Sequence, residues 1–141
     1  MNTDWEIIAR AAEQGLVQCA EALRQVYPSL LIRPFVSEND FFPARVSVAL
    51  SAFGERQVEH LVLYIGFHRN EASELDASAD VTQGDCPFFK FGPESSTGGD
   101  ETRLLPWALA HVAQSLEFFW DALPEIEAAL AQCLRDESTA S

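Results

Sequence analysis

Residues 61–68, LVLYIGFH, and residues 75–82, LDASADVT, decide the fold, because apolar side chains occupy every second position in both. A period of two is typical of a strand that buries one face and leaves the other in water. Residues 45–53, RVSVALSAF, show the same alternation, and Gly54-Glu55-Arg56 forms a turn after them. The sequence therefore predicts a hairpin of strands 45–53 and 57–68, followed by a strand over 75–82.

Two further strands are expected on either side of these three. Residues 30–36 are rich in β-branched and aromatic side chains, but Pro34 cannot donate to a ladder and so belongs at a sheet edge. Residues 86–91, CPFFKF, follow the turn residues Gln83-Gly84-Asp85 and predict a fifth strand, with 92–100 as a loop. The simplest sheet is an antiparallel meander.

Helical spacing of apolar residues brackets these strands. The first helix runs from Trp5 to Val26 and ends before Pro28, and the second begins at Leu104. Pro124 is expected to kink this second helix or to split it, with a further helix over 125–134, and the tail from Asp136 is expected to fray. Together these elements predict a single α+β domain over residues 1–141, a two-layer sandwich in which helices cover one face of about five antiparallel strands.

The other face of the predicted sheet is expected to be open to solvent or to a partner. By the alternation, its side chains are Arg45, Ser47, Ser51, His60, Tyr64, His68, Asp76, Ser78, Asp80 and Thr82.

Negative charge dominates the composition. Twenty-two acidic residues against nine basic ones give a net charge of −13. Such a field repels nucleic acids and anionic lipid surfaces and favours a partner protein with a basic surface. The apolar runs are too short to span a bilayer, and Asp4 and Glu6 stand where a signal peptide would be basic, so a cytoplasmic location is expected.

The cysteines and histidines are the candidate catalytic residues of this sequence. Cys19, Cys86 and Cys133 form no C-x-x-C pair, and we expect reduced, buried thiols, with Cys86 beside a turn as the one candidate nucleophile. Across the predicted sheet His68 meets Asp76, which is either a cross-strand polar pair or a carboxylate-oriented general base. Neither a nucleophile elbow nor a phosphate-binding loop is present, and the acids form no calcium-binding loop. We expect no enzyme activity, no metal and no cofactor.

Two segments are suited to binding a protein. Residues 37–43, SENDFFP, place adjacent aromatic rings beside acids in a loop, where the rings either form an exposed interface hot spot or tuck under the sheet. Residues 71–85 carry five acids and no base. The predicted partner-binding residues are Glu38, Asp40, Phe41, Phe42, Tyr64, Glu74, Asp76, Asp80 and Asp85.

In size, acidity, lack of a catalytic motif and helix–meander–helix layout, the whole chain resembles the small cytosolic immunity proteins that neutralise secreted bacterial toxins. The resemblance implies a tight complex with a toxin whose active-site cleft is basic. Two alternatives stay open: an effector chaperone of a secretion system, which is usually a homodimer, and a small enzyme using His68 with Asp76, or Cys86.

Overall fold

The computed structural model describes residues 3–51 and 58–140, and the side chains through residue 135. It contains α1 (Thr3–Val26), β1 (Leu31–Ser37), β2 (Ala44–Ser51), β3 (Leu61–Arg69), β4 (Leu75–Gln83), β5 (Lys90–Phe91), β6 (Ser95–Ser96) and α2 (Leu104–Ala140). The turn predicted at residues 54–56 lies outside the described residues. The two-layer α+β arrangement predicted from the sequence is confirmed.

The strands form one antiparallel sheet in the order β1-β2-β3-β4-β5, with β6 also paired to β4. From β1 to β5 consecutive strands are neighbours, so the predicted meander is confirmed. β1 is an edge strand, which places Pro34 where a missing N–H is tolerated.

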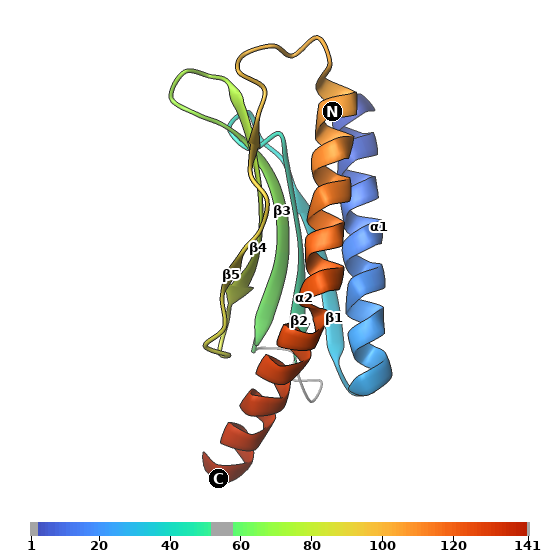
Figure 1. The fold of residues 1–141 in the computed structure, drawn as a ribbon, viewed down its shortest axis with the longest axis vertical. Helices are drawn as coiled ribbons and strands as arrows, with labels where there is room; N and C mark the ends of the chain where they lie inside the picture. The colour runs from blue at the N-terminus through green and yellow to red at the C-terminus, as the bar shows by residue number, and fades with distance from the viewer. Residues whose placement is uncertain (1–2, 52–57, 141) are drawn as a thin grey trace.

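Both helices lie on the same face of the sheet, α1 against β1 and β2, and α2 against β3 and β4 (Figure 1). The core between the layers consists of the alternating apolar residues of the strands and the apolar stripes of the helices. A side chain at Gly15 of α1 would collide with Leu116 of α2, so glycine allows the two helices to approach closely.

One end of the core is organised around Phe67 of β3, which is 1% exposed. Its ring contacts Trp5 of α1 and Trp107 and His111 of α2, with centroids 5.4 to 5.6 Å apart. Edge-to-face contacts of this kind add to the free energy of apolar burial. Both helices are thereby fixed against the end of the sheet where the loop 38–43 and the turn 70–74 emerge.

α2 is one continuous helix that contains Pro124, so the proline bends it without splitting it. Proline has no N–H to donate to the preceding turn and clashes with it, and the helix axis changes direction in its second half (Figure 1). The helix extends through Ala140, and the fraying from Asp136 stays a prediction.

The fifth strand predicted over 86–91 is wrong in extent. Only Lys90 and Phe91 join the ladder, opposite Val81 and Asp80. Pro87 lacks an N–H, and the N–H of Phe88 donates back to the carbonyl of Cys86 at 2.8 Å, which turns the chain away from β4. The loop predicted over 92–100 also contains a short strand, β6.

Candidate functional site

The face of the sheet opposite the helices is covered by no described element (Figure 1). We call it the open face. The strand register gives its side chains: Arg33, Phe35, Arg45, Ser47, Ala49, Val62, Tyr64, Gly66, His68, Asp76, Ser78, Asp80, Thr82 and Phe91.

Two residues predicted for the open face are fully buried instead. Ser51 and His60 are each 0% exposed and lie at the end of the sheet near the β4–β5 connection. There the backbone N–H groups of Gly84 and Cys86 both donate to the carbonyl of His60 at 3.1 Å, so the connection packs over this end. The usable open face is therefore shorter than predicted.

The loop between β1 and β2 holds one aromatic ring in solvent. The side-chain oxygen of Asn39 accepts hydrogen bonds from the N–H groups of Phe41 and Phe42 at 2.9 and 2.7 Å. The N–H of Arg69 donates to the carbonyl of Phe41 at 2.9 Å, which ties the loop to β3. Phe41 is 55% exposed, whereas Phe42 is half-buried. Phe41 is thus an apolar side chain presented on a preorganised turn.

Arg45 stacks on two rings of the open face, at the end of β2 next to the β1–β2 loop. Its guanidinium carbon lies 4.9 Å from the centroid of Phe42 and 5.8 Å from that of Tyr64. Burial raises the pKa of Tyr64, and the nearby charge of Arg45 opposes the rise. The Arg45 cation is therefore held on this face by stacking on aromatic rings.

His68 and Asp76 are direct cross-strand neighbours, as predicted. The distance from His68 Nε2 to Asp76 Oδ2 is 3.9 Å, which is too long for a hydrogen bond. The amide of Asn70 donates to the same carboxylate at 3.3 and 3.4 Å. This geometry fits a cross-strand polar pair better than an oriented general base.

Asp80 lies in the middle of β4, opposite Phe91 of β5. Burial raises the pKa of Asp80, a hydrogen bond from the Gly92 N–H lowers it, and the negative charge of Glu94 raises it further. The described residues place no basic side chain in an ion pair with Asp80 or Glu94. Asp80 is a partly desolvated carboxylate without a countercharge.

Sequence reasoning missed three residues of this site. Phe89 and Phe91 are 44% and 74% exposed, with ring centroids 4.5 Å apart. Glu94 follows them on the way to β6. The spacing of two between Phe89 and Phe91 in CPFFKF was the available signal, since such residues share a face of a strand.

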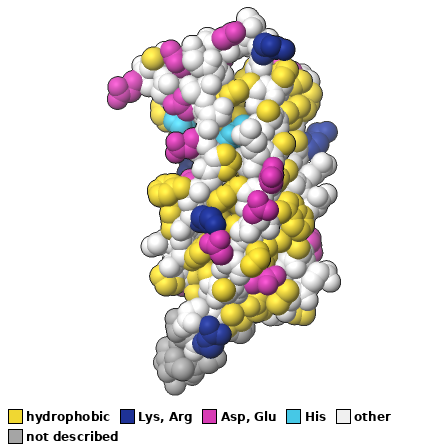
Figure 2. Space-filling view, viewed as in Figure 1, with side chains coloured by type: hydrophobic (Ala, Val, Ile, Leu, Met, Phe, Trp, Pro, Cys, Tyr) yellow, Lys and Arg dark blue, Asp and Glu magenta, His cyan; other side chains and the backbone are white. Residues whose placement is uncertain are grey.

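The structure gathers most of the predicted binding residues at one end of the molecule. Acidic side chains crowd the end where the β3–β4 turn lies (Figure 2). The strand register brings the loop 38–43, His68 and Asp76 to this end, and Tyr64 and Asp80 lie four residues further along β3 and β4 on the same face. Asp85 is not part of the group, because it follows β4 at the opposite end of that strand.

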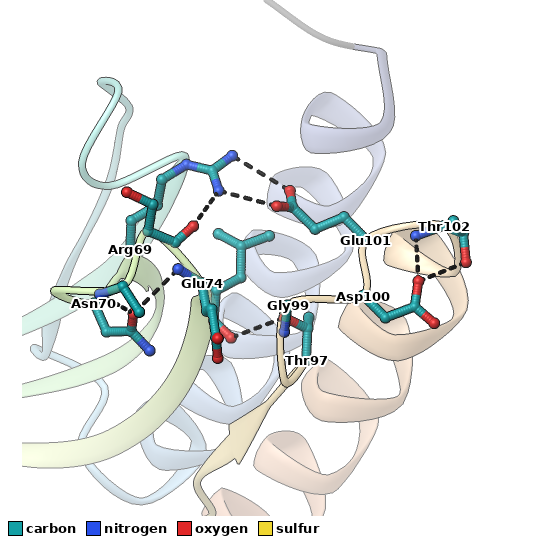
Figure 3. A network of polar contacts seen from close by, with 11 residues as sticks. Arg69, Asn70, Glu74, Thr97, Gly99, Asp100, Glu101 and Thr102 are labelled. Carbon is teal, nitrogen blue, oxygen red and sulfur yellow. Dashed lines mark hydrogen bonds and ion pairs between the residues drawn. The ribbon is translucent and has the colours of Figure 1, made fainter.

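A polar network stiffens this acidic end (Figure 3). Two nitrogens of Arg69 donate to the two carboxylate oxygens of Glu101 at 3.2 and 3.3 Å, joining β3 to the segment before α2. The Asn70 side-chain oxygen accepts from the N–H groups of Ala72 and Glu74 and shapes the turn. Arg69 is occupied by this pair, and no other described lysine or arginine forms an ion pair with Asp76 or Asp80.

The cysteines differ from expectation. Cys86 and Cys133 form a disulfide, with Cα atoms 5.7 Å apart, that joins the β4–β5 connection to the second half of α2. Cys86 therefore carries no thiolate for catalysis. Cys19 is free and buried, and burial raises its pKa to about 12.

Within residues 3–51 and 58–140, no group of three or more His, Cys, Asp or Glu side chains is arranged to hold a metal ion. Among the same residues, no helix is both long enough and apolar enough to cross a membrane. No family model, no curated protein and no solved structure matches the chain.

Proposed function

We propose that this chain is an acidic protein-binding module that docks its open face on a basic surface of another protein. One observation carries the proposal: the sheet face that no described element covers combines exposed aromatic rings with carboxylates that form no ion pair with a described lysine or arginine. Phe41 and Phe91 supply apolar area, and Asp76 and Asp80 supply charge. Aromatic anchors surrounded by polar groups carry most of the binding free energy in protein interfaces.

The net charge of −13 supports a basic partner over a second copy of the chain. Two copies meeting through this face would bring like charges together, whereas a basic surface is attracted over a long range and associates quickly. Following the resemblance in overall design, we propose that the module acts as an immunity-type inhibitor, covering the basic cleft of a secreted toxin. The disulfide makes an oxidising compartment the proposed place of this encounter.

The test is affinity capture from the native host, followed by identification and purification of the captured protein. Binding is then measured for wild type, for Phe41→Ser with Phe91→Ser, and for Trp120→Ser as a control. Trp120 is as exposed as Phe89 but lies on α2, away from the open face. We expect the open-face variant to lose at least about 2 kcal/mol of binding free energy, and the control to lose less than about 0.5. Equal losses in both variants would refute docking through the open face.

A further inference from the structure

Two depressions lined by described residues of the open face differ in charge balance. One, of about 420 Å³, is lined by residues of β1, β2 and β3 and contains the Arg33–Glu59 ion pair at 3.5 Å. The other, of about 490 Å³, is lined by His68, Asp76, Ala77, Ser78, Glu94, Ser95 and Ser96. This second depression holds two acids and, among its described lining residues, neither lysine nor arginine.

The wall that carries Glu94 is fixed in place. The indole N–H of Trp107 donates to the Ser95 hydroxyl at 2.8 Å, and the N–H of Thr97 donates to the carbonyl of Leu75 at 3.0 Å. On the opposite side, Asp76 is fixed by Asn70. Asp76 and the backbone that carries Glu94 are therefore held in place before binding, which lowers the conformational entropy that this chain loses when a partner docks.

One exposed ring lies beside the acidic depression, and a second lies further along the open face. Phe41 contacts the ring of His68, with centroids 6.2 Å apart. Phe91 lies opposite Asp80 at the other side of the face. A guanidinium is planar, pairs with carboxylates through a fork of donors and stacks on rings, whereas an ammonium is a compact and strongly hydrated charge. The stacking of Arg45 on Phe42 and Tyr64 is an instance of this preference on the same face.

We propose that this end of the open face binds an arginine side chain on a loop of the basic partner. The guanidinium enters the depression between Asp76 and Glu94, and the residues beside the arginine pack on Phe41 and Phe91. Charge complementarity selects this depression over the other, where Arg33 already neutralises Glu59. The inference rests on the proposed function, since it names the group that the open face recognises.

The test is an NMR titration of the ¹⁵N-labelled full chain with a short capped peptide containing two arginines. Two matched peptides replace the arginines by lysine or by citrulline, which is nearly isosteric but uncharged. With the arginine peptide we expect amide shifts at residues 66–68, 76–80 and 94–96. Lysine should bind at least about threefold more weakly and citrulline not measurably, and arginine binding should weaken as salt rises from about 0.02 to about 0.2 M. Equal binding of all three peptides would overturn the proposal.

Charge-matched variants locate the site. One double variant removes two negative charges at the depression, Asp76→Asn with Glu94→Gln. The other removes two negative charges on α2, Glu117→Gln with Asp121→Asn. We expect the first variant to weaken arginine-peptide binding at least about tenfold and the second less than about twofold. Because Asp76 also contacts Asn70, Glu94→Gln alone serves as a variant of an exposed side chain that leaves the turn intact. Equal weakening by both double variants, or shifts spread over the acids of α2, would show attraction to net charge alone.

Different results refute the docking face and the arginine site. If the captured partner needs Phe41 and Phe91 but tolerates the loss of Asp76 and Glu94, the docking face stands and the arginine site falls. If the peptide binds as expected while the partner ignores the open face, the arginine site stands and the proposed function falls.

Discussion

The ring of Tyr64 lies across the backbone of Gly66, two positions further along β3. A Cβ atom at position 66 would collide with the hydroxyl and ring carbons of Tyr64. The hydroxyl is also within hydrogen-bonding reach of Arg45 and Ser78. The centre of the open face is therefore shaped by one glycine that leaves room for one aromatic side chain.

Gly66→Ala is expected to displace the Tyr64 ring and to lower the free energy of unfolding by about 1–3 kcal/mol, the usual cost of overpacking. Urea unfolding measures the change. In Gly66→Ala combined with Tyr64→Ser the collision is gone, so the alanine should cost little relative to Tyr64→Ser alone. An alanine cost that is the same in both backgrounds would contradict this account of the contact.

The disulfide gives a second prediction. Unfolded, unreduced protein should show one free thiol, that of Cys19, and reduction should raise the number to three. Because the cross-link closes a loop between residues 47 positions apart, Cys86→Ser with Cys133→Ser should lower the free energy of unfolding by about 4 kcal/mol. Reductant should destabilise Cys19→Ala as it does the wild type and leave the double serine variant unchanged. Three free thiols before reduction would contradict the pairing.

The features predicted correctly from the sequence are those that repeat locally. Alternation in β2, β3 and β4 placed Tyr64, His68 and Asp76 on one face, and Pro34 marked the edge strand. The errors arise from contacts between distant segments. The disulfide joins residues far apart in the chain, and no spacing in the sequence predicts it. His60 continues the alternation of its strand and is still buried, because the β4–β5 connection packs over its backbone.

The acidic site was predicted only in part for the same reason. Glu38, Asp40 and Asp76 lie at the same end of the sheet because the β1–β2 loop and the β3–β4 hairpin both emerge there, which follows from the meander. Glu94 joins them through the attachment of Ser95 to Trp107 of α2, a contact without a local pattern. Asp85 was grouped with Asp76 by nearness in sequence, although a whole strand separates them.

His111 gives a prediction on pH. It is 1% exposed, its Nε2 lies 3.1 Å from the Ser78 carbonyl, and its Nδ1 has no hydrogen-bond partner in the described structure. Burial lowers its pKa below 6.5, and the bond to Ser78 opposes this. The folded protein therefore favours the neutral ring. The contribution of His111 to the stability of the fold is complete above the pKa that it has in the unfolded chain, and it is lost as pH falls toward the pKa that it has in the folded protein.

Urea unfolding at a series of pH values tests this contribution. Between about pH 6.5 and the folded pKa, stability should fall with a slope of at most about 1.4 kcal/mol per pH unit from this residue. His111→Gln keeps a donor for the Ser78 carbonyl and does not titrate, so the difference between the two proteins isolates the histidine. Parallel pH profiles would rule out the contribution.

Asp80 and Asp100 should titrate on opposite sides of the usual aspartate value of 3.8. Burial raises the pKa of Asp80, whereas hydrogen bonds from the hydroxyl and the N–H of Thr102 lower that of Asp100. Carbon-detected NMR of the carboxyl groups measures both directly. A pKa of Asp80 below that of Asp100 would contradict the structure.

The same shifts predict opposite effects on stability. Asp80 favours the fold when protonated, and that contribution is lost as pH rises through its folded pKa, so at neutral pH its charge opposes folding. Asp80→Asn should raise the free energy of unfolding there, by less than about 0.5 kcal/mol for so exposed a group. Asp100 stabilises the fold above pH 3.8, and this stabilisation is lost as pH falls through the pKa of Asp100 in the folded protein. Asp100→Ala should therefore destabilise the protein at neutral pH. If Asp80→Asn gains stability and loses affinity for the captured partner, the acid is retained for binding and not for folding.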